Sequence, residues 1–110
     1  MVMDSLVPSL PVLLILRALE ESPGHGYKIA RWVEERSGRQ LMLKEGTLYP
    51  TLHQLERQGL IQGHWDKTGS KRPTKVYELT QEGRAQLCAD REQWVKRVTV
   101  AQRVLWEGGV

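Results

Sequence analysis

The chain has 110 residues, of which 40% are hydrophobic, with a net charge of +3 and a pI near 9.2. This length predicts a single domain with one modest core and leaves little room for the second layer of an enzyme. The mild positive charge permits contact with an anionic polymer such as nucleic acid, but does not by itself establish it.

Cysteine usage and hydropathy bear on where the protein works. The single cysteine, Cys88, cannot form an internal disulfide, and we expect it to be a small residue on a helix rather than a redox sensor. The apolar run at residues 12–16 is far shorter than the roughly 20 residues that a membrane span needs. We therefore expect a soluble cytoplasmic protein with no membrane partner.

The first predicted helix runs from residue 11 to about residue 21 and is apolar on nearly every side. Such a helix must form the centre of a core or lie partly in a subunit interface. Ser9 is a suitable cap, and Pro11 suits the first helical position. The breaker cluster Ser-Pro-Gly-His-Gly at residues 22–26 ends this helix.

A second, amphipathic helix is predicted from residue 26 or 27 to residue 36, with Ile29 and Val33 on its buried side. Gly38 should stop it. The connector at residues 39–43 alternates too briefly to assign.

The third predicted helix, residues 45–58, is the one around which the others are arranged. Its apolar residues recur at i, i+4 and i+7 and share one stripe, namely Leu48, Leu52 and Leu55. Pro50 requires the helix to begin about one turn before it, and Gly59 can close it in the left-handed conformation. Three helices with tight connectors form a helix-turn-helix arrangement, and small polar groups on the third could enter a DNA groove.

A β-hairpin is predicted after the third helix, with strands at residues 60–65 and 74–79. The loop between them and the start of the return strand carry one acid, Asp66, and four cations: Lys67, Lys71, Arg72 and Lys75. This composition is typical of a wing that contacts phosphates. A merely solvated loop is the alternative.

The last predicted helix begins after Thr80, a suitable cap, and extends to about residue 107. It spans roughly 27 residues or about 40 Å, more than this domain can bury. A heptad seam, interrupted once by Arg91, runs along it, so we expect a homodimer. The predicted dimer interface comprises Leu87, Trp94, Val98, Ala101 and Leu105.

Metal and catalytic patterns are absent from the sequence. The three histidines and Cys88 fall on different predicted elements, with no spacing typical of metal ligands. No glycine-rich phosphate loop and no recognisable nucleophile–base arrangement is present. We expect a binding protein, not an enzyme, with no metal and no cofactor.

Four tryptophans supply much of the aromatic volume, since the chain has no phenylalanine. Ordinary packing is expected for Trp32, Trp65 and Trp106. Trp94 lies midway along the seam, where two-fold symmetry would bring it near its counterpart. Plain interface packing and a stacking site for a ligand both remain open there.

Several motifs together resemble the PadR family of bacterial transcriptional regulators. They are His-Gly-Tyr at 25–27, Gly-Thr-Leu-Tyr-Pro at 46–50, Lys-Val-Tyr at 75–77 and Leu-Thr-Gln-Glu-Gly at 79–83. The resemblance covers about residues 10–106 and extends to the small subfamily that includes multidrug-responsive repressors. It implies a mainly α fold with a small β-hairpin: a winged helix-turn-helix domain at 1–80 and a C-terminal dimerisation helix at 81–110.

The resemblance also implies a function: a homodimer that binds a pseudo-palindromic operator in double-stranded DNA, usually as a repressor released by a small molecule. The DNA-contacting residues that it implies are Lys44, Thr47, Tyr49, Thr51, His53, Gln54, Lys71, Arg72 and Lys75. Trp94 matches a tryptophan that stacks flat aromatic ligands in multidrug-responsive members. Lys44 departs from the family pattern, in which a small residue is common.

Two other functions compete with DNA-dependent regulation. One is a sensor whose aromatic ligand, bound at Trp94, matters more than DNA. The other is a winged-helix module that binds a protein. The sequence names neither the operator nor the effector, and it does not distinguish a repressor from an activator.

Overall fold

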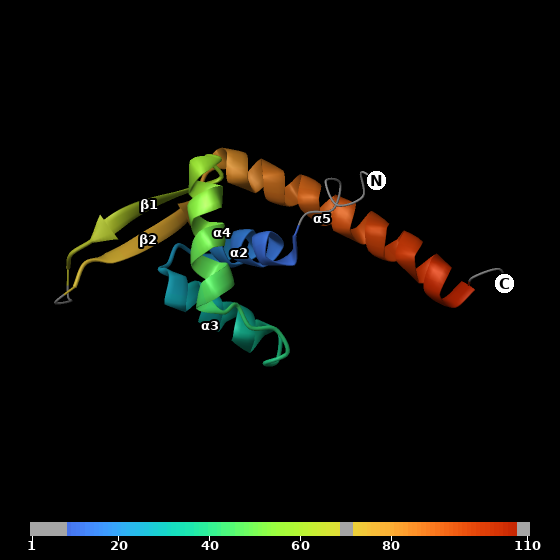
Figure 1. Cartoon of the computed structure of the whole chain (residues 1–110). Coiled ribbons are helices and arrows are strands. Elements are labelled where there is room, and N and C mark those ends of the chain that lie inside the picture. Colours follow the sequence, from blue (N-terminus) through green and yellow to red (C-terminus); the bar gives the residue numbers. More distant parts are fainter. Residues whose placement is uncertain (1–8, 69–71, 108–110) are drawn as a thin grey trace.

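The computed structural model describes residues 9–68 and 72–107, which form a helical body with a two-stranded wing and a long tail helix (Figure 1). In chain order the elements are α2 (Leu10–Glu21), α3 (Gly26–Arg36), α4 (Glu45–Arg57), β1 (Ile61–Asp66), β2 (Thr74–Leu79), α5 (Gln81–Gln102) and the π-helical segment η1 (Arg103–Glu107). The predicted fold class, a winged helix-turn-helix with a long C-terminal helix, is confirmed.

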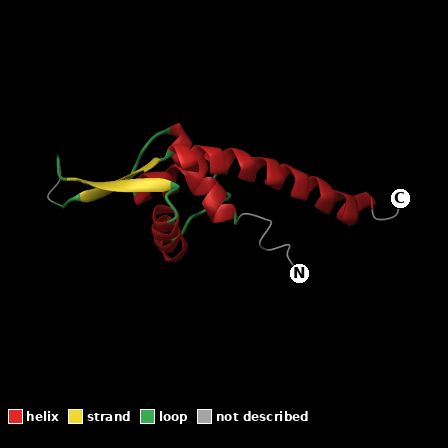
Figure 2. Ribbon diagram, turned by 90° about the horizontal axis from the view of Figure 1, so that it is seen from above, coloured by secondary structure: helices red, strands yellow, loops and turns green. Residues whose placement is uncertain are grey.

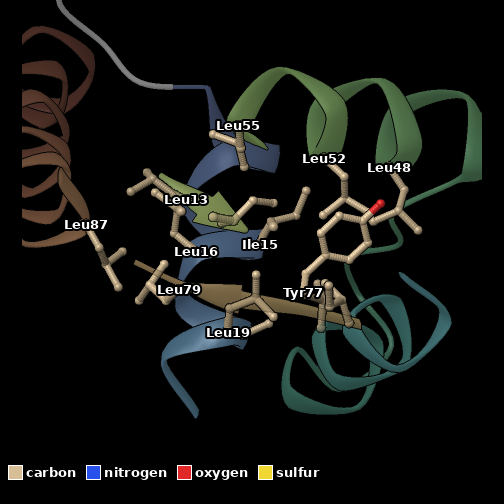
Figure 3. Packing of buried hydrophobic residues seen from close by; sticks show 14 residues of the cluster. Leu13, Ile15, Leu16, Leu19, Leu48, Leu52, Leu55, Tyr77, Leu79 and Leu87 are labelled. Carbon is tan, nitrogen blue, oxygen red and sulfur yellow. The ribbon is translucent and has the colours of Figure 1, made fainter. Parts of the chain in front are cut away.

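Helix α2 is the centre of the core. The Ser9 hydroxyl caps it by accepting a hydrogen bond from the Val12 amide at 3.3 Å, as predicted, while Pro11 stands at the second helical position instead of the first. The helix contacts α3, α4, α5 and β2, so most of its apolar surface is covered. Its buried residues are Leu13, Ile15, Leu16, Ala18 and Leu19 (Figure 3).

Helix α3 starts at a histidine cap. The His25 Nδ1 atom accepts a hydrogen bond from the Lys28 amide at 3.1 Å. Ile29 and Val33 are buried, as predicted, and half-buried Trp32 packs against the core. The α3 start is also tied to the wing, because Gly24 and Tyr77 exchange two backbone hydrogen bonds of 3.0 and 2.9 Å.

Helix α4 follows the predicted stripe. Its three leucines are at most 2% exposed, and Tyr77 lies beside Leu48 and Leu52 (Figure 3). At the C-terminus the Gly59 amide donates to the Glu56 carbonyl and the Leu60 amide to the Leu55 carbonyl, both at 3.0 Å. This Schellman closure requires Gly59 at φ +75°, in the left-handed region.

The wing is anchored to the core at the base of its two strands. Ile61 pairs with Leu79 and Gly63 with Tyr77, and this face of the hairpin enters the core, whereas the Trp65–Lys75 pair stands further out along the hairpin. The outer part of the hairpin projects away from the helices (Figure 2).

Two of the tryptophans do not pack as expected. Trp65 is 61% exposed and Trp106 is 74% exposed, so the prediction of ordinary packing was wrong for both. Trp65 stands on the outer half of the hairpin and Trp106 near the end of the tail helix, where the described part of this chain covers each of them only in part.

Helix α5 packs on the body only near its start. The Thr80 hydroxyl accepts a hydrogen bond from the Gly83 amide at 3.0 Å, and Leu87 is buried. One turn further, the Arg91 guanidinium donates to the Glu20 carboxylate at 2.7 Å. The remainder runs away from the body, on the side opposite the wing, which gives the molecule extents of 61 × 29 × 23 Å (Figures 1 and 2).

Candidate nucleic-acid interface

The side of α4 opposite its buried leucines carries the groups expected to read DNA. Thr47, Tyr49, His53 and Gln54 are exposed, while Thr51 is half-buried. The Thr51 hydroxyl donates to the Thr47 carbonyl at 2.6 Å, so its proton is used within the helix. The Thr51 oxygen is therefore left as an acceptor, which could pair with an N–H group on a base edge but not with a phosphate oxygen.

A groove of about 490 Å³ separates this face from the wing and the start of α3. The predicted residues that line it are Tyr49, His53, Arg72 and Lys75. The structure thus brings side chains from α4 and from the hairpin to one concave surface. A strand of a duplex that touched α4 could contact the wing at the same time.

Several residues that line this groove were not predicted as site residues, among them His25, Tyr27 and Trp65. His25 and Tyr27 belong to the His-Gly-Tyr motif, which the sequence shows but does not place in space. Trp65 could have been found from strand alternation, because it lies two positions after Gly63 and four after buried Ile61, on the same face of the hairpin. Their side chains add aromatic surface and polar atoms to the groove.

Gly26 sets how closely α3 and α4 approach at the bottom of this groove. A Cβ atom there would lie 2.8 Å from Cε1 of Tyr49 and 3.0 Å from its hydroxyl oxygen. The Tyr49 ring therefore rests on the first turn of α3, where any larger residue would displace it. This contact gives a physical reason for glycine in the His-Gly-Tyr motif.

Lys44 lies outside the main groove. It is the exposed N-cap residue of α4, and it lines a neighbouring depression with Tyr27, Arg31 and Tyr49. Its cation extends the positively charged surface past the start of the helix.

The three cations predicted for the wing are placed differently by the structure. Lys71 lies outside the described residues, whereas Arg72 is exposed and lines the groove. Lys75 is half-buried, and its ammonium donates to the Glu56 carboxylate at 2.9 Å. That Lys75 contacts DNA stays a prediction, while in the unbound chain its charge is paired with Glu56.

This ion pair also changes how both groups titrate. The hydrogen bond from Lys75 lowers the pKa of the Glu56 carboxyl, and the same bond raises the pKa of the Lys75 ammonium. Both groups stay charged across the neutral range.

The tail helix offers a second, largely apolar groove of about 330 Å³ between α2 and α5. Trp94, 37% exposed, lines it together with Leu10, Leu14, Arg91 and Val95.

The five residues of the predicted dimer interface differ in exposure: the first is buried in its own chain and the other four lie on the surface. Leu87 is 1% exposed in the core of its own chain, so it is not available to a second copy and is removed from the predicted interface. Trp94 and Val98 are each 37% exposed and Leu105 is 68% exposed. Ala101 is also exposed. These four remain open to an outside partner.

Metal sites and membrane-spanning helices are a separate question. Among the described residues, no three His, Cys, Asp or Glu side chains gather as ligands of a metal ion would. No helix within residues 9–68 and 72–107 combines the length and apolar character that crossing a bilayer requires.

Comparison with known proteins adds to this geometry. The model of the transcriptional regulator PadR-like family matches residues 15–89. The transcriptional regulator Rv3488 of Mycobacterium tuberculosis (strain ATCC 25618 / H37Rv) is 38% identical over 79 residues, which cover 72% of this chain and 70% of that protein.

Solved structures agree in fold. A PadR family transcription regulator from hypervirulent Clostridium difficile R20291 is 31% identical, with a TM-score of 0.74, over 88% of this chain and 99% of the other. Bacillus subtilis PadR in complex with operator DNA is 28% identical, with a TM-score of 0.67, over 74% of this chain and 46% of the other.

Proposed function

The chain belongs to the PadR-like family of transcriptional regulators, and from that premise we propose that it binds an operator in double-stranded DNA as a homodimer. In this proposal it represses transcription until a small molecule releases it. Family members are transcriptional regulators, which agrees with the prediction that the chain is not an enzyme.

One observation carries the DNA-binding part of the proposal: the exposed face of α4 and the wing border the same groove. We propose that α4 enters the major groove, where Tyr49, His53 and Gln54 reach base edges or phosphates. Lys44, Thr47 and Thr51 lie along the same helix start, and Lys71 and Arg72 contact the neighbouring backbone. A solved relative, 28% identical, is bound to operator DNA, which supports double-stranded DNA as the partner.

The shared groove also supports DNA over a protein as the partner. If the wing and α4 lay on different faces of the molecule, that arrangement would support a protein-interaction module. Here Tyr49 on α4 and Arg72 on the wing line one surface. That surface presents cations, hydroxyls and ring nitrogens, which are the groups that bind phosphate and base edges.

The dimer in this proposal is made by the exposed part of α5. Trp94, Val98, Ala101 and Leu105 form an apolar stripe that the described part of this chain leaves exposed to solvent, at 37% for Trp94 and Val98 and 68% for Leu105. Pairing two such stripes would hold two copies of α4 so that each reads a half-site about 34 Å from the other. We accordingly propose that residues 1–80 form the DNA-binding domain and residues 81–110 the dimerisation helix, with Leu87 anchoring that helix to its own body.

Release by an effector is the second part of the proposal, and the groove at Trp94 favours it. Its lining is almost entirely apolar, and Arg17 and Arg91 lie at its border. A planar aromatic molecule could stack on the indole there. Sensing of such a ligand, without DNA, is the alternative function that this groove supports.

A mobility-shift titration with DNA from the region upstream of its own gene tests the main proposal. We expect binding that weakens steeply with salt, because phosphate contacts release counterions. Replacing Lys71 and Arg72 together by alanine should weaken binding to specific and nonspecific DNA alike, and flatten the salt slope by about 0.9 for each phosphate that is no longer neutralised. No binding at low salt would refute the proposal.

Fluorescence titration with planar aromatic cations tests the effector. A bound ring should quench the Trp94 emission, and the quenching should disappear in a Trp94→Ala variant. Because three other tryptophans emit, a Trp106→Ala variant serves as the matched control and should keep the quenching. Equal quenching in all three proteins would remove Trp94 from the ligand site.

A further inference from the structure

We propose that Glu56 is a positioning residue that locks the wing onto α4, and that Lys75 affects operator binding through this lock and not through a phosphate. The inference rests on the proposed DNA-binding function. It concerns how the two parts of the reading surface are held at one angle.

The Glu56 carboxylate joins three elements. It projects from the last turns of α4, and its Oε1 atom accepts a hydrogen bond from Lys75 Nζ on β2 at 2.9 Å. Its Oε2 atom accepts one from the Gly63 amide on β1 at 3.3 Å. A single side chain thus ties both strands of the wing to the helix that is proposed to read bases.

The Gly63 amide is available for this contact because of the strand register. Tyr77 exchanges its backbone hydrogen bonds with Gly24, so the Gly63–Tyr77 pair is of the type that does not exchange hydrogen bonds. The Gly63 amide therefore points outward from the edge of β1. Glu56 supplies the acceptor that this edge would otherwise lack.

The Lys75 ammonium is held on several sides. Besides Glu56, it lies 5.8 Å from the ring centre of Trp65 and 5.5 Å from that of Tyr77. Its chain runs across Gly63, where a Cβ atom would stand 2.6 Å from Cε of Lys75. The Lys75 ammonium is therefore held in one position by the carboxylate, by the two aromatic rings and by the space that glycine leaves beside its chain.

If the Lys75 side chain moved to contact a phosphate, the loss of its present contacts would cost free energy. It would leave the Glu56 carboxylate unpaired beside a polyanion and give up both ring contacts. The side chains of Lys75 and Glu56 are only 26% and 30% exposed, so water would compensate for this loss incompletely. The arrangement favours a cation that neutralises Glu56 and stays in place when DNA binds.

Removing the charge of Glu56 should change the affinity for DNA in opposite directions under the two explanations, the lock and simple electrostatics. Replacing Glu56 by alanine removes a negative charge from a protein that is proposed to bind a polyanion, and charge alone would then tighten binding. If Glu56 positions the wing, Glu56→Ala should instead weaken operator binding about tenfold. Glu45→Ala is the matched control, because it removes an acid from the other end of the same helix and should not weaken binding.

Lys75 is tested by titrating operator DNA at several salt concentrations. We expect Lys75→Met to weaken binding with an unchanged slope of log K against log salt, while Arg72→Ala makes this negative slope shallower by about 0.9. The double variant Glu56→Ala/Lys75→Met should be no weaker than the worse single variant, because the pair acts as one unit. A slope made as shallow by Lys75→Met as by Arg72→Ala, or Glu56→Ala binding more tightly than wild type, would overturn the proposal.

A measurement without DNA keeps the lock testable in its own right. Amide exchange followed by NMR should show the Gly63 amide exchanging at least about tenfold faster in Glu56→Ala, with the Gly24 amide unchanged as an internal reference. Unaltered Gly63 exchange would refute the lock. Wild-type protein that never binds the operator would refute the proposed function, while the exchange result would still report on the lock.

Discussion

Helix α4 and the outer part of α5 carry the same kind of apolar spacing and use it differently. In α4 the spaced leucines are at most 2% exposed, and the helix is held on the body through them. In α5 the residues at positions 94, 98 and 105 are 37%, 37% and 68% exposed. A stripe in the sequence therefore identifies an apolar face, but not whether the same chain covers it.

The change from buried to exposed apolar residues occurs within α5. Leu87 is buried in the body and Arg91 is bonded to Glu20, whereas Trp94, one turn further, already faces a groove that is open to solvent. The helix thus changes from a core element to an unpaired surface over about two turns. Leu14 of α2 and Leu87 line the same groove as Trp94.

The largest expected effect follows from deleting a buried leucine. Leu52→Ala, at a position that is 0% exposed, should lower the free energy of unfolding by about 2–5 kcal/mol through reduced burial and a residual cavity. Leu105→Ala, at 68% exposure, should change it by less than about 0.5 kcal/mol in dilute solution. Urea unfolding followed by circular dichroism compares the two, and equal losses would contradict the division between body and tail.

The second effect concerns association. Val98→Glu would place like charges together in a two-fold interface, so we expect the dimer to weaken at least tenfold, as measured by sedimentation at micromolar concentration. Val104→Glu is the matched control, because Val104 is exposed but lies off the proposed seam. If both variants dissociate equally, the seam is wrongly assigned. A wild-type protein that stays monomeric would remove the proposed dimer itself.

A smaller effect compares two glycines of the α4 region. Gly59→Ala forces a side chain into the left-handed conformation at φ +75° and should destabilise the fold by about 1–2 kcal/mol. Gly46→Ala stands in the helix with open space around its Cβ, so it should stabilise by up to about 1 kcal/mol. Thermal unfolding should show shifts of opposite sign, and shifts of the same sign would contradict this account.

The smallest effect is the pH dependence of the Glu56–Lys75 pair. The pKa of Glu56 is lowered from 4.5, so its contribution to stability is present above that value and is lost as pH falls through the folded pKa. The pKa of Lys75 is raised from 10.5, so its contribution is present below that value and is lost as pH rises through the folded pKa. Between these limits the contribution should stay level.

Acid unfolding provides the measurement for this pair. Because both side chains are partly exposed, we expect Glu56→Gln to cost about 1 kcal/mol or less at neutral pH, and to lose less stability than wild type below pH 4.5. Identical acid limbs for the two proteins would show that the pair contributes nothing to stability.

Much of the fold followed from local chemistry. Ser9, Thr80 and Gly59 mark helix ends through groups that act within a few residues, and the leucine spacing of α4 marks its buried side. The hairpin strands could be read from their β-branched and aromatic residues.

The site was predicted less completely. Tyr49, His53 and Arg72 could be chosen from motifs, and they line one groove. His25, Tyr27 and Trp65 were missed because they reach the groove only when α3 and the wing pack beside α4. Lys75 was predicted to contact DNA, and nothing in its own segment shows that Glu56, far away in the sequence, pairs with it in the unbound chain.

The sequence by itself determined where helices and strands begin and end, which face of each is apolar, and which family the chain resembles, because these depend on contacts between residues close in the chain. Only the tertiary structure decided that Leu87 belongs to the body, that Trp65 faces the groove and that Lys75 is already paired. Burial and charge pairing are set by neighbours that folding brings from distant segments.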